Sequence, residues 1–363
     1  MKKIIVGLCI VVLVAVFGGR AYYLRKQTKS ETDRIIKIGF LSDLSGFSSP
    51  SGKEALSGAQ EAVKEINNKP EYGFKIKLSV QDHKFLAKDS LSAFKKALND
   101  EIQGLIIMGS VPVLTLAPLV EQAKIPTIAT SAANTEIPSL SNWMFRGWIY
   151  VKPQADLLAD FIKNDLGVNE VAIFKIKNQF GDDYEDNFSQ AYANLEGKVV
   201  LTESFSISDT DVKSQVAKII DKNPKAVVVF GFEHGVAAAI DTLKEQGYSG
   251  AILTTPDAMV DYAIWKSKGA DVYFTSTTWD FLDPNNKMSL HAMFAYIGTL
   301  LLAEAIKNAS DNGADSIRQA LLNIKNFDTP LGKISYDEKR EIIFPKLLIK
   351  QMQPDGTTKI VRE

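Results

Sequence analysis

The chain has 363 residues, of which 45% are hydrophobic and 23% are charged. This length and composition predict about two globular domains with a sizeable core and exclude an intrinsically disordered chain. Because 42 Lys and Arg nearly balance 43 Asp and Glu, the formal net charge is -1, and no global positive field exists to attract nucleic acid.

An export element is predicted at residues 1–26. The pair Lys2-Lys3 precedes the apolar run Ile4–Gly19, as in a secretory signal, and Gly19-Arg20-Ala21 is a small-x-small site where a signal peptidase could cut. The apolar character extends to Leu24, close to the length of about 17 residues that spans a bilayer, so a retained membrane anchor is the alternative. Either interpretation places the rest of the chain outside the cytoplasm.

The single cysteine, Cys9, lies inside this apolar run and directly follows Leu8. A lipoprotein signal instead has a small residue before a cysteine at the end of its run, so lipidation is not expected. With no second cysteine the exported part forms no disulfide, and its stability must come from packing.

Strands and helices alternate after a polar linker at residues 27–33. The apolar segment Ile35–Leu41 predicts a buried strand, and the apolar spacing in Glu54–Asn67 predicts a helix after a loop rich in Ser, Gly and Pro. The same patterns continue with strands Lys75–Gln81, Gly104–Met108 and Thr127–Ala129 and helices Lys88–Asn99, Thr115–Ala123 and Gln154–Asp165. This alternation predicts a parallel sheet with helices on both faces.

A second series of the same kind follows, and it predicts a second doubly wound unit. Its strands are Val171–Lys175, Lys198–Phe205, Ala226–Phe230 and Ala251–Thr254, and its helices are Asp183–Leu195, Val212–Asn223 and Gly235–Gln246. After a polar turn at residues 283–287 come a long helix, Leu290–Ala309, and a final pair of strands, Gly332–Tyr336 and Phe344–Gln351.

The motifs of common enzymes are incomplete or missing. Residues 46–53 resemble a phosphate-binding loop, but five residues instead of four separate the glycines, and no Ser or Thr follows the lysine. The histidines, His83, His234 and His291, are too far apart to form a metal-spaced pair and are interpreted as surface or loop residues. The acidic run at 182–186 is interpreted as the start of a helix rather than a metal site. We therefore expect a binding protein without a cofactor or metal, not an enzyme.

Short motifs occur in a characteristic order between residue 36 and about residue 356. They are Ile36–Leu41, Leu44-Ser45-Gly46, Gly58–Ala62, Glu65-Ile66-Asn67, Ala117-Pro118, Ile125-Pro126, Phe145-Arg146, Phe180-Gly181, Val216–Ile219 and Tyr336-Asp337. This order resembles the leucine/isoleucine/valine-type substrate-binding proteins of ABC importers. The resemblance implies the type I periplasmic-binding fold, an α/β fold with two doubly wound parallel-sheet lobes joined by a hinge. Lobe 1 would comprise 34–150 plus 280–343, and lobe 2 would comprise 151–279 plus 344–363.

The resemblance implies that hydroxyls and backbone amides of lobe 1 hold the carboxylate of an amino-acid-like ligand. The matching positions are Ser110 and the loop Ser131-Ala132-Ala133-Asn134. Neutral donors near helix N-termini can hold a carboxylate without burying a countercharge. Val111 and Pro112 depart from the family's serine cluster, and a proline removes one amide donor. For Ser131 and Asn134 the alternative role is helix capping.

From lobe 2 the resemblance implies two aromatic residues, Phe180 in a tight turn and Phe232, and an acid, Asp257, that meets the ligand's ammonium. A buried cation needs such a countercharge. The alternative is that Asp257 is only a turn residue after Pro256. Because the family's tyrosines are phenylalanines here, a more apolar pocket is expected.

We therefore expect an extracytoplasmic solute-binding protein, in the periplasm or at the outer face of the cytoplasmic membrane. It would capture a small ligand by hinge closure and deliver it to an ABC permease. The alternative is a membrane-anchored sensor or accessory protein that uses the same fold to regulate a partner. Aromatic residues near the predicted crossovers, Trp148, Tyr150 and Trp279, either line the cleft or pack in the core.

Overall fold

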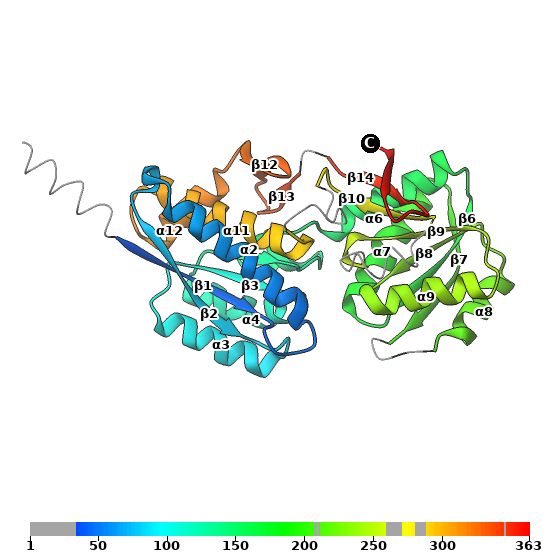
Figure 1. Ribbon diagram of the computed structural model, residues 1–363, viewed down its shortest axis with the longest axis horizontal. Helices are drawn as coiled ribbons and strands as arrows, with labels where there is room; N and C mark the ends of the chain where they lie inside the picture. Colours follow the sequence, from blue (N-terminus) through cyan, green and yellow to red (C-terminus); the bar gives the residue numbers. More distant parts are fainter. Residues whose placement is uncertain (1–33, 207–208, 210, 259–270, 280–287, 345) are drawn as a thin grey trace, which may run out of the picture.

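The computed structural model describes residues 34–206, 209, 211–258, 271–279, 288–344 and 346–363. The predicted signal or anchor, the linker at 27–33 and the polar turn at 283–287 lie outside these residues. Two α/β bodies lie side by side along the long axis of the molecule, each built around its own sheet (Figure 1).

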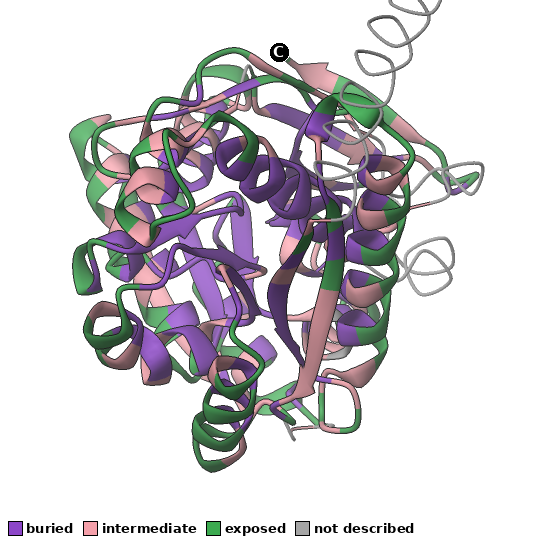
Figure 2. Cartoon of the chain, turned by 90° about the vertical axis from the view of Figure 1, so that its left-hand side faces the viewer, coloured by how far each residue is buried: buried purple, intermediate pink, exposed green. Residues whose placement is uncertain are grey.

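The first body contains a five-stranded parallel sheet in the order β2-β1-β3-β4-β5. The strands are β1 (Ile35–Ser42), β2 (Lys75–Asp82), β3 (Gly104–Met108), β4 (Thr127–Thr130) and β5 (Met144–Arg146). The central strands are buried on both faces, which explains their continuous apolar sequences. Figure 2 shows these buried strands in purple, surrounded by helices with exposed outer faces.

Alternate side chains of the first sheet enter two separate clusters, as the period of a strand requires. Ile38 and Ile106 pack with α2 (Ser49–Asn67) and α11 (Leu290–Asn308), whereas Leu105 packs with residues of the other face. The remaining helices of this body are α3 (Ala87–Asn99), α4 (Ser110–Ala123), α5 (Ile137–Leu140) and α12 (Ala314–Leu322), with the short helix η1 at Pro70–Tyr72.

The second body contains a seven-stranded sheet in the order β15-β14-β10-β9-β8-β6-β7. Its parallel strands are β6 (Glu170–Ile176), β7 (Lys198–Phe205), β8 (Ala226–Phe230), β9 (Ala251–Thr254) and β10 (Val272–Ser276). Two antiparallel strands, β14 (Leu348–Met352) and β15 (Thr358–Arg362), extend the sheet beyond β10. Its helices are α6 (Val151–Asp160), which continues into a π-helical turn at Phe161–Asp165, and α7 (Gln179–Asn194), α8 (Lys213–Asp221) and α9 (Glu233–Glu245).

A small antiparallel sheet completes the first body. It contains β11 (Phe327–Thr329), β12 (Gly332–Tyr336) and β13 (Ile342–Ile343). Tyr336 of β12 packs edge-on against Phe145 of β5, with ring centroids 5.1 Å apart. The final two strands expected from the sequence therefore fall in different sheets, because the segment after residue 343 supplies β14 to the second body.

The α/β class and the parallel sheets agree with the sequence, but several helices begin earlier than expected. The helices α2, α4 and α7 begin at Ser49, Ser110 and Gln179. These starts are not evident in the sequence, because the first turns are polar or contain Pro or Gly and show no apolar period. Residues 49–53, interpreted as part of a loop, are helical. Helix α12 and the strands β5, β10, β11, β13 and β15 were not expected.

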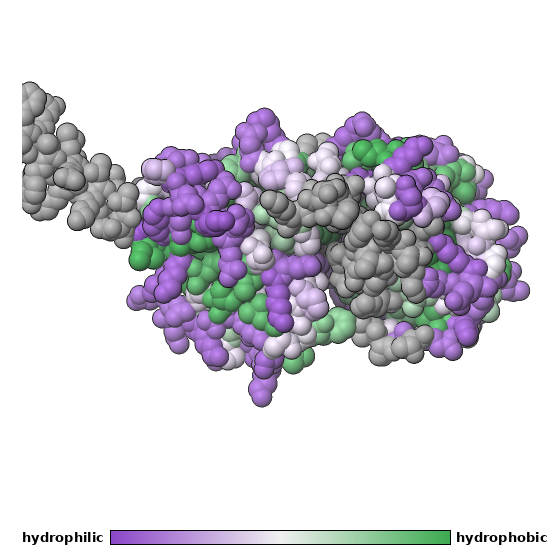
Figure 3. Space-filling model, viewed as in Figure 1, coloured by the Kyte–Doolittle hydropathy of each residue, from purple (hydrophilic) through white to green (hydrophobic). Residues whose placement is uncertain are grey.

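Helix α11 is long and apolar enough to cross a membrane by length and composition, and no other helix of the described residues is. It is a core helix in this structure, because 83% of its apolar window is buried between α2 and the first sheet. Hydrophilic residues, purple in Figure 3, cover most of the outer ends of both bodies on the face shown, as expected for helices with one apolar side.

Candidate functional site

The first predicted ligand residue, Ser110, begins α4 at the carboxyl end of β3. Gly109 before it has φ 91°, a conformation that favours glycine, and an added Cβ there would lie 2.5 Å from the Phe85 ring. Pro112 lies in the first turn of α4, where amides have no partner inside the helix. The helix thus tolerates this proline, but one amide fewer is available to an anion.

The loop after β4 carries the residues Ser131 to Asn134. Ser131 has φ 50°, in the left-handed region that non-glycine residues seldom adopt, and its Oγ lies 2.8 Å from Nδ1 of His291. Asn134 is 1% exposed, and its amide donates to Asp183 of α7 at 3.2 Å. Helix α5 has Glu136 at its N-cap, so neither Ser131 nor Asn134 has the capping role.

Two of the predicted residues of the second body form an aromatic cluster. The rings of Phe180 and Phe232 are 4.5 Å apart, and Phe180 is 4.9 Å from Tyr184. Phe180 lies in the first turn of α7 rather than in the expected tight turn, because the Asn178 side chain caps the helix by accepting from Gly181 N. Gly181 is needed there, since an added Cβ would lie 2.0 Å from the carbonyl oxygen of Ile176.

Asp257 follows β9 in a short 3-10 helix, Pro256–Ala258. It accepts hydrogen bonds from Trp148 Nε1 and from the Tyr184 hydroxyl, both at 3.3 Å. Burial raises the pKa of the Asp257 carboxyl from 3.8 to about 6, although hydrogen bonds from Trp148 and Tyr184 lower it. This carboxyl therefore turns inward, toward a residue of the first body, and is more than a surface turn residue.

A buried chain of hydrogen bonds fixes the direction of the Tyr184 hydroxyl. Thr275 Oγ1 donates to Gln154 Oε1 at 2.7 Å, and Gln154 Nε2 donates to the Tyr184 oxygen at 2.8 Å. Because this oxygen already accepts a bond, its proton is free to point at Asp257. Both neighbours of Asp257 therefore act as donors and favour its ionised form, whereas burial opposes it.

His291 is a site residue that the sequence did not indicate. It lies in the first turn of α11 and stacks on Trp148, with centroids 5.3 Å apart and planes at 7°. Burial lowers the pKa of His291 from 6.5 to about 4, so the imidazole is neutral at pH 7. This histidine is therefore a partly buried helix residue rather than a surface or loop residue, whereas His83 lies in the loop after β2, as expected, although it is 0% exposed.

The structure brings most of the predicted residues to the junction of the two bodies. A continuous path runs from Ser131 through His291 and Trp148 to Asp257. A second contact joins the loop at residues 134–135 to Asp183. Within the described residues Ser110 forms no hydrogen bond to these groups. His291 was missed because an isolated histidine in an apolar helix has no distinctive spacing.

Two cations near this junction are paired with acidic residues. Lys175 of β6 forms ion pairs with Asp182 and Glu185, and Arg146 of β5 pairs with Glu341. No set of three or more His, Cys, Asp or Glu that could hold a metal occurs among the described residues.

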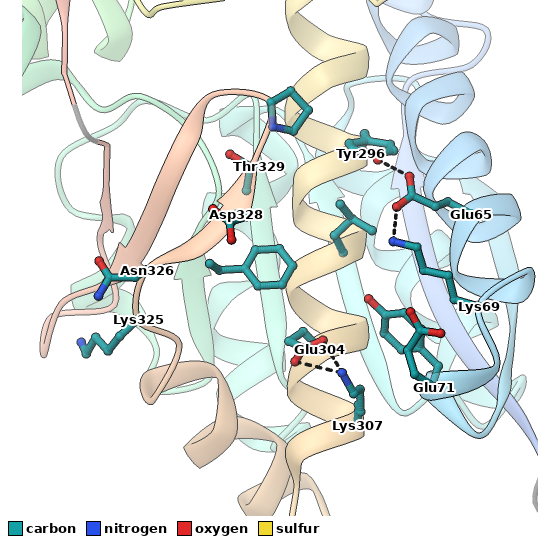
Figure 4. Close-up of a pocket in the computed structure, with 14 residues that line it drawn as sticks. Glu65, Lys69, Glu71, Tyr296, Glu304, Lys307, Lys325, Asn326, Asp328 and Thr329 are labelled. Atoms are coloured by element: carbon teal, nitrogen blue, oxygen red, sulfur yellow. Dashed lines mark hydrogen bonds and ion pairs between the residues drawn. The ribbon is translucent and has the colours of Figure 1, made fainter.

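A separate groove of about 550 Å³ lies on the first body, between the end of α2, α11 and β11 (Figure 4). Its charged side chains are largely paired with one another. Lys69 contacts Glu65 at 2.6 Å, and Lys307 contacts Glu304 at 3.3 Å. None of the predicted ligand residues lines it.

Comparison with known proteins gives one consistent result. Residues 35–356 match the family described as "Periplasmic binding protein". The Leu/Ile/Val-binding protein homolog 1 of Brucella suis is 22% identical, over 95% of this chain and 94% of that protein. The leucine-binding protein LivK of Thermotoga maritima has a TM-score of 0.80 at 19% identity, over 90% of this chain and 97% of that chain.

Two further solved structures contain different ligands. LivJ of Streptococcus pneumoniae, in complex with isoleucine, has a TM-score of 0.79 at 22% identity and covers 91% of this chain and 100% of its own. A solute-binding protein of Rhodopseudomonas palustris, in complex with 3,4-dihydroxybenzoic acid, has a TM-score of 0.79 at 20% identity and covers 91% and 96%. The type I fold and the resemblance found in the sequence are thereby confirmed. The ligands of these two neighbours belong to different classes, an amino acid and an aromatic acid.

Proposed function

Because this chain belongs to the periplasmic-binding-protein family, we propose that it captures an amino-acid-like ligand at the junction of its two bodies and delivers it to an ABC permease. The family consists of solute-binding proteins of ABC transporters, which bind small molecules outside the cytoplasm. The proposal adds the class of ligand, the residues that hold it and the partner.

The environment of Asp257 carries the proposal. Its hydrogen-bond partners in the described part of the chain are the neutral groups of Trp148 and Tyr184. A partly buried carboxylate without a cation is costly, and a ligand ammonium would provide the missing positive charge. An aromatic acid would instead add a second anion near Asp257 and Asp183, which like-charge repulsion disfavours.

The opposite end of such a ligand fits the loop after β4. In the tautomer of neutral His291 whose Nδ1 carries the proton and donates to the Ser131 oxygen, the Ser131 hydroxyl can donate to a carboxylate, as can the amides of Ala132 and Ala133, without a countercharge. Between the two ends, Phe180 and Phe232 provide an apolar surface for the ligand side chain. This arrangement supports an amino acid with an apolar side chain.

Closure around the ligand follows from how the chain connects the bodies. It passes between them after β5, between β10 and α11, and between β13 and β14. We take lobe 1 as 34–150 plus 280–343 and lobe 2 as 151–279 plus 344–363. A ligand held by Ser131 in one lobe and Asp257 in the other stabilises the closed state, since only that state makes both contacts.

Thermal-shift measurements with a panel of solutes test this function. We expect isoleucine or a related apolar amino acid to raise the melting temperature, because a ligand at 100 times its Kd stabilises by about 2.7 kcal/mol. Benzoate and 4-hydroxybenzoate should have no effect. A shift with the aromatic acids and none with any amino acid would contradict the ligand class, and no shift with any small solute would contradict capture.

A further inference from the structure

Arg146, the last residue of β5, is 0% exposed, and its guanidinium donates to two backbone carbonyls as well as to its ion-pair partner. Its Nε and Nη2 donate to the Glu341 carboxylate at 2.6 and 3.2 Å. Its Nη1 donates to the carbonyl of Ala132 at 2.7 Å, and Nη2 also donates to the carbonyl of Asn134 at 2.6 Å. The guanidinium therefore joins the predicted ligand loop to the segment between β12 and β13.

These two carbonyl contacts determine where the loop amides point. In a trans peptide the C=O and the next N–H point in opposite directions. The carbonyl of Asn134 faces Arg146, and the N–H of Thr135, in the same peptide plane, donates to Asp183 of the second body at 3.1 Å. By the same geometry the carbonyl of Ala132 faces Arg146, so the N–H of Ala133 points away from the guanidinium.

The loop needs such external support. Ser131 has φ 50°, a conformation that costs free energy for a residue with a Cβ and persists only where its surroundings impose it. A lysine could not replace the arginine, because three donors on a single nitrogen cannot span two carbonyls and a carboxylate as the planar guanidinium does.

We infer that Arg146 is a positioning residue that fixes the peptide planes of residues 132–133 and 134–135, so that one amide faces the ligand carboxylate and the other faces Asp183. The inference rests on the proposed function for the role of this loop. The buried side chain of Arg146 thus orients both the amide that binds the ligand carboxylate and the amide that contacts Asp183 of the second body, although Arg146 itself does not touch the ligand.

The matched variants Arg146→Lys and Glu341→Gln separate this role from plain stabilisation. Both weaken the buried ion pair and should lower the melting temperature. Glu341→Gln keeps the guanidinium and its carbonyl contacts, so its Kd for isoleucine should stay within about threefold of the native value, whereas Arg146→Lys should raise Kd by at least about tenfold. Equal losses of stability with unchanged Kd in both variants would overturn the inference.

Hydrogen exchange provides a measurement that requires no ligand. We expect Arg146→Lys to accelerate exchange in peptides covering residues 130–137 and Glu341→Gln to leave them nearly native. If native protein binds neither isoleucine nor any other apolar amino acid, the proposed ligand class is wrong, yet this comparison still decides the role of Arg146. Unchanged exchange at 130–137 in Arg146→Lys would overturn it.

A double variant covers the case in which Arg146→Lys does not fold. Arg146→Met with Glu341→Leu removes both charges together, a replacement that buried ion pairs often tolerate. A folded double variant should show the same fast exchange at 130–137 and the same loss of isoleucine affinity. Native exchange in that variant would contradict a positioning role.

Discussion

Trp148 donates a hydrogen bond from its indole Nε1 to Oδ1 of Asp257 across 3.3 Å, although one follows the last strand of the first sheet and the other follows β9 of the second. The indole is the only group of the described first body that donates to this carboxylate. A ligand amine that reaches Asp257 therefore meets it beside Trp148, at the boundary of the two bodies.

Replacing Asp257 by Asn tests its role as countercharge. We expect Asp257→Asn to weaken isoleucine binding by about 1.5–3 kcal/mol, the range for hydrogen bonds to charged groups, as measured by isothermal titration calorimetry. The shape is kept and asparagine can still form the turn. The unliganded variant should be at least as stable as the native protein, because burial disfavours the ionised carboxyl. Native affinity in a stable variant would remove Asp257 from the site.

The affinity for an amino acid should depend on pH through the same carboxyl. Burial raises the pKa of Asp257 to about 6 in the unliganded protein, and an ammonium binds the ionised form. Affinity should therefore fall as the pH drops below about 6, and binding near pH 6 should release protons. Calorimetry in two buffers of different ionisation enthalpy measures that release. Asp257→Asn is the control and should show none.

His291 should reduce stability in acid. Its pKa is lowered by burial to about 4 from 6.5, so the folded state disfavours its charged form. Its contribution is fully present above pH 6.5 and is lost as the pH falls toward 4. His83, whose pKa burial also lowers, acts in the same direction. Urea unfolding at pH 7 and pH 4.5 should show a smaller loss for His291→Asn than for the native protein. Equal losses would contradict this assignment.

Asp183 should hold the two bodies together without determining the fold. It accepts from Asn134 Nδ2 and Thr135 N of the first body, at 3.2 and 3.1 Å. Asp183→Ala should raise the dissociation rate of isoleucine by about 3- to 10-fold, with a nearly native melting temperature. Asp186→Ala, an exposed change on the same helix, is the control. Stopped-flow displacement measures the dissociation rate of isoleucine from both variants. Equal rates would contradict a role of Asp183 in holding the two bodies together.

The sequence predicted what local pattern determines. Buried strands such as Gly104–Met108, Ala226–Phe230 and Ala251–Thr254 have the bounds expected from their apolar runs. Helix starts were placed too late because the first turn of a helix depends on capping rather than on apolar spacing, as Asn178 illustrates at α7. The strand β10 has only three consecutive apolar residues before Thr275 and Ser276, and this short run was not recognised as a strand.

In the candidate site, too, the sequence predicted some residues but not the contacts that orient them. The resemblance placed Asp257 and Ser131 at the junction, but the contacts that orient them join residues far apart in the chain. Ser131 meets His291 across 160 positions, and Arg146 meets Glu341 across 195. Such pairs leave no trace in local spacing, because each partner alone is an ordinary buried or surface residue. Only the packed structure identifies them.

The interleaved connection of the two bodies determines when the chain can fold during synthesis. Helix α2 packs against α11, which is made more than two hundred residues later, and Tyr273 of β10 pairs with Gln351 of β14. No contiguous half of the chain therefore contains a complete body. The strands of the first sheet have all been made when the ribosome reaches Arg146, but α11, which packs on α2, is complete only at Asn308, and the second sheet is complete only when β15 has been made. Stopping synthesis before β14 would leave β10 as an open sheet edge, which is a template for aggregation.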